Sequence, residues 1–478
     1  MNKLFVVIVA VALATAIYIP NLRAQGDDWY VSAANYARYY HFKETKLDSA
    51  ATRFQFDVYM GKFYTGAWYE VAHVMSEGFG NYTSNSLSQR YFGWEDNDLT
   101  IHAGNFYQVF DRGLILNTFR DDEVGADLVL DGIQLNWRKK YLDLDLLTAT
   151  PGIGDLLFGA KEMIRGGRLK FKPASKFHLG GAYVSYITDT RTNLNQVNAR
   201  INLDYLDGYV EYAKRNYQVP DPDDFTRTLN KTGDGTYGLI TGYYSYFTGF
   251  FEYKNYKFLS YPEIGILNTP PAVNRRDRLL QSEAANYFMS ITGERGYRGN
   301  LSISWSDYWG FETDYAKAYS RDSINVYLYE YYFGIRGNYF EDNTFHTSLD
   351  LLEFSKRDET KSEFEIEYYL TDFATISLST HMTIFEPVDS SEYTEKYLDI
   401  TYAIAPNFCL SVGRSTSDND FIRQPERKMS YIQLKYTYGN HDLTIFYGGE
   451  RGGLVCSGGL CAYHPTFEGL KATLFSRF

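Results

Sequence analysis

Apolar and polar residues alternate along most of the chain from about residue 52 onward. Phe364, Ile366 and Tyr368 alternate with Glu365 and Glu367, and the same two-residue period recurs in many other runs. Successive side chains of a strand point to opposite faces, so this period predicts strands with one apolar and one polar face. No long run has a convincing helical period. We therefore expect an all-β protein.

Short and long connections between these runs tend to alternate, which is typical of transmembrane β-barrels. Tight turns are predicted at Gly61–Lys62, Glu95–Asp98, Lys139–Lys140, Pro173–Lys176, Asp207–Gly208, Thr371–Asp372, Ala405–Asn407 and Gly439–Asn440. Longer connections rich in Gly, Asn, Asp and Ser are predicted at 72–87, 106–128, 150–162, 218–234, 259–282, 385–393, 418–427 and 449–466.

The expected fold is a single large antiparallel transmembrane β-barrel of about 22–24 strands, with short periplasmic turns and longer extracellular loops. The barrel would occupy residues 52–478, and no linker divides it into domains. Residues 283–319 hold an odd number of runs, so one strand there is missed or invented. Residues 25–51 form either a first strand or a short periplasmic or lumenal segment.

The first 24 residues have the pattern of a secretory signal peptide. Lys3 gives a positive start, Leu4 to Ile19 is an unbroken run of apolar or small residues, and a cleavage site follows Ala24. A retained anchor helix is the alternative, although the run is slightly short for a membrane span and Pro20 follows it at once. We therefore expect an exported protein.

Composition fits a barrel with one face in lipid. Of 478 residues, 18% are aromatic, with 45 Tyr and 33 Phe, yet the mean hydropathy is −0.37. A barrel strand needs apolar groups only at alternate positions, and Tyr and Trp suit the membrane interface. The net charge of −12 argues against a nucleic-acid partner and hints at a preference for cations.

The C-terminal run Leu470–Phe478 is amphipathic and ends on an aromatic residue. Leu470, Leu474 and Phe478 lie on one face of the predicted strand, and Lys471 and Arg477 lie on the other. This ending resembles the signal by which Gram-negative outer-membrane proteins are recognised for assembly. Phe478 is therefore expected to engage the barrel-assembly machinery, and outer-membrane lipid and lipopolysaccharide to surround the barrel.

Charged residues gather in the predicted loop 106–128, and they suggest three alternatives. A loop folded into the barrel would make a charged constriction that selects solutes by size and charge. A solvated outer loop would instead hold weak local ion pairs. A divalent-cation site is the third alternative, although the spacing is not that of an EF-hand. The candidate residues are Asp111, Arg112, Arg120, Asp121, Asp122, Glu123 and Asp127.

Two further loops carry recognisable groups. Arg275, Arg276 and Arg278 could face acidic groups across the lumen or bind an anionic solute or a lipopolysaccharide phosphate, or they could simply be solvated. Cys456 and Cys461 are predicted to form a local disulfide in a Gly-rich loop, with metal binding as the alternative. The remaining cysteine, Cys409, is expected to be a small buried or lipid-facing residue.

Motifs of the common enzyme classes are missing from the sequence, so no catalytic residue, cofactor or metal is assigned. His102 and His381 fall on predicted polar faces, where a barrel hydrolase could pair one of them with Ser or Asp across strands. Such histidines more often line a lumen. We therefore expect a protein that is not an enzyme.

Residues 104–132, Pro270–Pro271, Gly293–Tyr297 and the loop Arg451–Cys461 resemble a family of large outer-membrane β-barrels from Bacteroidetes-type Gram-negative bacteria. The family is described as porin-like and of unknown function. The resemblance implies a fold and an outer-membrane location, and it implies no substrate and no catalytic residues.

The expected function is a porin-like channel for small polar or charged solutes, with loop 106–128 narrowing the lumen. The alternative is a plugged barrel that serves surface binding, assembly or export, or, less favoured, an outer-membrane barrel hydrolase. We do not expect a TonB-dependent transporter, because no N-terminal plug domain is predicted before the strands.

Overall fold

A computed structural model describes residues 29–478 apart from short gaps and one long one. The gaps are 77–79, 123–125, 153–161, 189, 222–226, 260–292, 307, 321–326, 340–342, 355–356, 389, 421, 423, 458–459 and 465. The predicted signal peptide therefore lies outside the described residues. No helix among the residues described is long and apolar enough to cross a membrane.

Twenty-four strands of the described chain form one antiparallel sheet, which confirms the predicted fold at the upper end of its strand range. In the first half of the chain these are β1 (Trp29–Phe42), β2 (Leu47–Met60), β3 (Phe63–Ser76), β4 (Gly80–Asp96), β5 (Leu99–Phe106), β8 (Leu130–Arg138), β9 (Leu142–Pro151), β10 (Met163–Ala174), β11 (Phe177–Ile187), β12 (Arg191–Leu203), β13 (Leu206–Pro220), β14 (Thr228–Tyr244) and β15 (Phe247–Lys257).

The second half supplies eleven more wall strands. They are β16 (Glu294–Ile303), β17 (Trp309–Ser320), β18 (Tyr327–Tyr339), β19 (Asn343–Phe354), β20 (Arg357–Thr371), β21 (Ala374–Pro387), β22 (Tyr393–Ile404), β23 (Phe408–Ser417), β24 (Lys428–Tyr438), β25 (His441–Glu450) and β28 (Phe467–Arg477). Two short hairpins stand apart from the wall: β6 (Arg120–Asp121) with β7 (Ala126–Asp127), and β26 (Gly453–Ser457) with β27 (Leu460–His464). One 3-10 turn, η3 (Gln424–Arg427), precedes β24.

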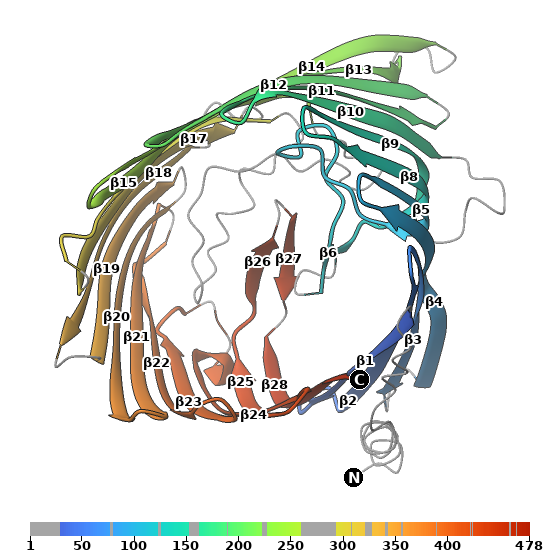
Figure 1. Cartoon of the computed structure of the whole chain (residues 1–478). Helices are drawn as coiled ribbons and strands as arrows, with labels where there is room; N and C mark the ends of the chain where they lie inside the picture. The colour runs from blue at the N-terminus through green and yellow to red at the C-terminus, as the bar shows by residue number, and fades with distance from the viewer. Residues whose placement is uncertain are drawn as a thin grey trace.

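The sheet closes on itself because its first and last strands pair (Figure 1). The register of β1 and β28 runs from Ala34 opposite Arg477 to Phe42 opposite Gly469. Phe478 extends the pairing: its backbone N–H donates to the Ala33 carbonyl at 2.8 Å, and the Ala33 N–H donates back at 3.2 Å. Every wall strand therefore has two neighbours and no edge is left unpaired, as a membrane-spanning sheet requires.

The connections gather at two unlike ends of the barrel. One end carries tight turns such as Gly61–Lys62, Asn97–Asp98 and Gly439–Asn440, together with the chain end at Phe478. We call it the turn end. The other end, the loop end, carries the long connections, among them 107–129 and 451–466. The short and long connections that alternate along the sequence therefore lie at opposite ends of the barrel.

The two faces of the wall have opposite character. Val197, Val210 and Ile240 point outward and are 60%, 52% and 53% exposed. Gln196 and Glu211, each one position along a strand from such a residue, point inward and are 3% and 0% exposed. An apolar outer face and a polar inner face explain how a chain that is polar on average can span lipid.

Aromatic residues form a belt around the turn end. They lie in or beside the tight turns and are largely exposed: Tyr205 (69%), Tyr246 (60%), Tyr308 (56%), Phe373 (68%) and Tyr438 (68%). Their rings suit the boundary between acyl chains and headgroups. The belt accounts for part of the high Tyr content.

Three turn and loop predictions are wrong. The loop predicted at 218–234 is mostly strand in its described part, because β13 runs to Pro220 and β14 starts at Thr228. The turn between β12 and β13 is Asp204–Tyr205 and not Asp207–Gly208, because Leu203 pairs with Leu206 and Asp207 already lies within β13. Residues 72–87 are largely strand, with β3 running to Ser76 and β4 starting at Gly80. The strands are polar where they approach the loop end, so their composition resembles that of a loop.

Two open questions of the sequence are resolved. Within 25–51, Trp29–Phe42 is the first strand, so the barrel starts earlier than residue 52. Within 283–319, the described residues hold two strands, β16 and β17, which restores an even count.

Candidate functional site in the barrel lumen

The connection between β5 and β8, residues 107–129, lies inside the ring of strands (Figure 1). We call it the lumen loop. It folds back on itself: Val109 forms a bridge with Asn117, the Phe110 N–H donates to the Leu116 carbonyl at 3.0 Å, and the Thr118 N–H donates to the Gln108 carbonyl at 3.0 Å. The segment therefore has its own internal structure.

The tip of the lumen loop is an apolar cluster held against the wall. Phe110, Leu114, Ile115 and Leu116 are at most 1% exposed. They share a hydrophobic core with inward-facing residues of β10 to β14, namely Ile164, Val184, Leu194, Ala213 and Tyr237. Full burial of one such aliphatic side chain stabilises by about 1.5–3 kcal/mol, so the tip alone fastens the loop firmly.

Backbone conformation at the tip depends on two residues. Asp111 and Gly113 adopt positive φ angles of 52° and 82°. A Cβ at Gly113 would lie 2.9 Å from the Asn117 Cβ, so glycine fits both the angle and the space. The tight turn positions the neighbouring apolar side chains so that they pack against the inner face of the wall.

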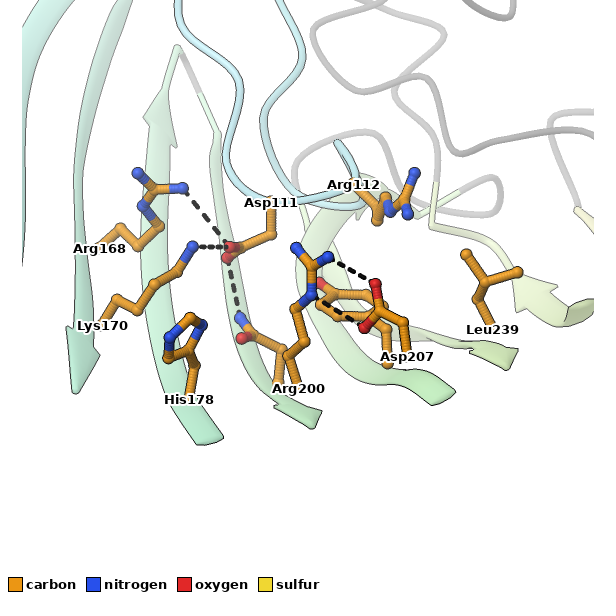
Figure 2. A pocket seen from close by; sticks show the side chains of 10 residues that line it. Asp111, Arg112, Arg168, Lys170, His178, Arg200, Asp207 and Leu239 are labelled. Atoms are coloured by element: carbon orange, nitrogen blue, oxygen red, sulfur yellow. Dashed lines mark hydrogen bonds and ion pairs between the residues drawn. The ribbon is translucent and has the colours of Figure 1, made fainter. Parts of the chain in front are cut away.

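Asp111 is the polar anchor of the tip (Figure 2). Its carboxylate is 3% exposed and accepts from Gln196 Nε2 at 2.9 Å and Asn198 Nδ2 at 2.8 Å. Arg168 Nη1 and Lys170 Nζ each lie 3.4 Å from its Oδ1. A carboxylate buried to this degree is tolerated only when donors and cations surround it, and here β10 and β12 supply them.

Below the tip is a cavity of about 270 Å³ whose lining is rich in basic side chains. Arg112 enters it from the lumen loop, with its guanidinium 5.7 Å from the Tyr209 ring centroid and 5.8 Å from that of Tyr237. Arg200 and Asp207 pair across it (Figure 2). The lining residues are Asp111, Arg112, Arg168, Lys170, His178, Asn198, Arg200, Asp207, Tyr209 and Leu239.

A second anchor, the ionic latch, ties the far part of the lumen loop to β2 and β3. Arg120 contacts Glu70 at 3.0 Å, Asp122 at 2.9 Å and Asp127 at 3.2 Å. Arg53 of β2 contacts Asp122 at 3.0 Å. Both guanidiniums lie over the Trp68 ring, at 5.6 and 5.3 Å. The latch therefore consists of Arg53, Glu70, Arg120, Asp122 and Asp127.

The latch changes the acidity of its central carboxyl. Burial opposes ionisation of Asp122, but hydrogen bonds from Arg53 and Arg120 outweigh it and lower the pKa of Asp122 below its ordinary value. Tyr107 donates to Asp127 at 2.7 Å, and burial together with that carboxylate raises the pKa of the Tyr107 hydroxyl. The latch therefore favours the ionised form of Asp122 at neutral pH.

Of the seven predicted loop candidates, five have the wall and loop contacts just described. Asp121 is in β6, opposite Ala126 of β7. Glu123 lies outside the described residues, as do Arg275, Arg276 and Arg278. Among the residues described, no group of three or more His, Cys, Asp or Glu is arranged to hold a metal ion. The charges of the loop are mostly paired with one another and with the wall.

A second segment lies within the ring in projection, the β26–β27 hairpin (Figure 1). Cys456 and Cys461 are register partners in this hairpin, while their side chains lie outside the described part of the chain. Arg451, at the base of the hairpin, contacts Glu395 at 2.9 Å and donates to the Arg427 carbonyl at 3.1 Å. The predicted disulfide stays a prediction.

Cys409 corrects one expectation. It lies 3.9 Å from Ser411 Oγ on β23, on the face opposite the outward Val412, so it faces the lumen rather than lipid. The wall partners of the lumen loop are the residues that the sequence did not single out. In the sequence, Arg168, Lys170 and Asn198 alternate with apolar residues, but alternation gives no information on which residues meet across a lumen.

Comparison with known proteins gives a family and a fold. A family model described as "Family of unknown function (DUF6029)" matches residues 1–304 and 362–478. A search of curated proteins finds no match to the sequence. None of the three similar structures described next carries the name of an enzyme.

The translocation pore of the P pilus usher PapC is similar with a TM-score of 0.53 and 10% identity, covering 94% of this chain and 99% of that one. An E. coli P pilus tip assembly intermediate, PapC-PapD-PapK-PapG, is similar with a TM-score of 0.55 and 10% identity, covering 93% of this chain and 60% of that one. The siderophore receptor PirA of Pseudomonas aeruginosa is similar with a TM-score of 0.46 and 9% identity, covering 94% of this chain and 80% of that one. The usher similarity shows the fold, a large closed β-barrel.

Proposed function

The chain belongs to the family of unknown function DUF6029, and we propose that it is an outer-membrane channel for small polar or charged solutes. In this proposal the lumen loop sets the width of the pore and the turn end faces the periplasm. The proposal rests on one observation: the lumen loop is attached to two separate parts of the inner wall, at β10–β14 and at β2–β3.

Two anchors of different chemistry make the loop a fixed part of the channel. The apolar tip excludes water from its contact with the wall, and the ionic latch holds the other part through charge-assisted hydrogen bonds. A loop held in this way narrows the lumen permanently, because it does not move in and out of the pore at random. Solutes would pass the basic cavity below the tip, where Arg112 has tyrosine rings as its neighbours.

Partners follow from the architecture. The apolar outer face fits membrane lipid and lipopolysaccharide, and the last strand, with Phe478 closing on Ala33, fits delivery by the barrel-assembly machinery. We propose transport as the main role, with a small solute as the transported species and no cofactor or nucleic acid.

A plugged barrel for surface binding, assembly or export is the second candidate, because the β26–β27 hairpin also lies within the ring in the projection of Figure 1. Conductance in planar bilayers separates the two. The purified folded wild-type barrel should give unitary current steps as a channel. A folded barrel that gives no steps at any voltage until residues 453–464 are deleted would be a plugged barrel, and the channel proposal would fail.

A further inference from the structure

A serine, a histidine and a glutamate on the inner wall form a connected chain of polar contacts. His381 Nε2 lies 2.7 Å from Ser379 Oγ, and His381 Nδ1 lies 3.4 Å from Glu363 Oε1. Glu363 of β20 is directly opposite His381 of β21, and Ser379 is two residues along the same strand and therefore on the same face. The three side chains are brought together by register alone.

The arrangement assigns a role to each ring nitrogen of His381. A carboxylate beside Nδ1 favours a proton on that nitrogen, which leaves the Nε2 lone pair free to accept from the Ser379 hydroxyl. Ser348 Oγ donates to Glu363 Oε2 at 3.0 Å and fixes the carboxylate. Glu365 Oε1 is a second acceptor 3.4 Å from Ser379 Oγ, a longer contact than that to the imidazole.

Access differs between the base and the hydroxyl. His381 is 4% exposed, whereas Ser379 lines a cavity of about 900 Å³ near the turn end. Arg336 is the one lysine or arginine among the described residues that line this cavity, and it supplies positive charge there. A hydroxyl that faces a wet cavity with a buried base behind it is the arrangement of an activated nucleophile.

We propose that Ser379 is a nucleophile that hydrolyses small carboxylic esters entering the lumen, with His381 as general base and Glu363 as its positioning residue. Ser379 Oγ forms a bond to the ester carbonyl carbon while His381 Nε2 takes its proton. The tetrahedral intermediate collapses, the carbon–alkoxide bond breaks, and the proton passes to the leaving alcohol. Water then attacks the acyl-serine by the same route and releases the carboxylic acid. This activity is independent of the channel proposal.

A fluorophosphonate probe on the purified full-length barrel tests the assignment without any variant. Peptide mass spectrometry should find the adduct on Ser379. Hydrolysis of p-nitrophenyl butyrate should be lost in Ser379→Ala and fall roughly 10²–10⁴-fold in His381→Gln. Glu363→Gln should lower kcat with little change in KM, and Glu363→Asp should restore part of it.

Ser377→Ala is the matched control, because Ser377 lies two residues earlier on the same face of β21, where it is opposite Glu367 and Thr401 rather than Glu363. It should keep the wild-type rate, and heat-modifiable migration on gels checks that each variant is folded. Folded wild-type barrel without an adduct on Ser379 would overturn the proposal. So would a folded Ser379→Ala variant that hydrolyses the ester at the wild-type rate.

Discussion

At the scale of single residues, the lumen holds charges in pairs that cross from loop to wall. Asp111 shows the principle: a nearly fully buried carboxylate receives two amide donors and two cations from β10 and β12. Removing one member of such a group leaves its partners buried and uncompensated, which costs more than the pair contributes on its own. A single substitution of a charged residue in the lumen should therefore change the ion selectivity of the channel.

Asp111→Ala should make the channel more selective for anions. The variant removes one negative charge and leaves Arg168 and Lys170 without this carboxylate, so the reversal potential in a KCl gradient should move toward that of chloride. Asp204→Ala is the control, because Asp204 is in a tight turn, is 74% exposed and pairs with Lys176 at the surface. An equal shift in both variants would show that the lumen position has no special effect.

At the scale of elements, the lumen loop is a unit with two anchors that can be loosened separately. The sequence identified the charged residues of this loop as candidates but not its apolar tip as an anchor. The run Leu114–Leu116 reads equally well as part of a strand. Only the closed barrel brings inward-facing Ile164, Val184 and Leu194 to it. Contacts of this kind depend on positions far apart in the chain, which local periodicity does not encode.

Ile115→Ala should release the tip while leaving the barrel intact. Truncating a fully buried Ile costs about 2–5 kcal/mol, and the cost falls on the docking of the lumen loop. Limited chymotrypsin digestion of the folded barrel should then cut within 107–129. Val109→Ala is the matched control, since Val109 is on the same loop and 40% exposed. Equal resistance of both variants would contradict the anchoring role of the tip.

Acid should open the ionic latch. The pKa of Asp122 is lowered in the folded loop, so its stabilising effect is fully present above the ordinary value of 3.8 and is lost as the pH falls through the lower, folded value. Channel noise and mean conductance should therefore be constant at neutral pH and rise in strong acid. Asp122→Asn should show the acid behaviour at pH 7. An Asp122→Asn channel identical to wild type at both pH values would show that the latch does not hold the loop.

At the scale of the whole molecule, the fold was largely predictable, whereas the site was predictable only for the charged residues of the lumen loop. Alternation along runs such as Phe364 to Tyr368 reports which face of a strand is apolar, and short turns report strand order, so the barrel and its two unlike ends follow. Strand ends were harder, because the polar loop-end portions of β3 and β4 resemble loops. The pairing of Ser379 with His381 was also beyond reach, since it depends on side-chain geometry.

Barrel closure should depend on the last residue. Deleting Phe478 removes both backbone hydrogen bonds to Ala33 and the aromatic end of the terminal strand. The fraction of heat-modifiable, membrane-inserted barrel should fall sharply, whereas Phe478→Tyr should retain it. Normal amounts of folded barrel from the deletion variant would mean that the terminal residue contributes little to assembly.

The central claim is that the lumen loop sets the width of an open pore. Single-channel conductance of the wild type and of a variant with residues 110–116 replaced by a short Gly-Ser link tests it most directly. Both proteins should migrate as folded barrels, and the shortened loop should give clearly larger unitary current steps. Identical steps in the two proteins, or no steps in either, would contradict the claim.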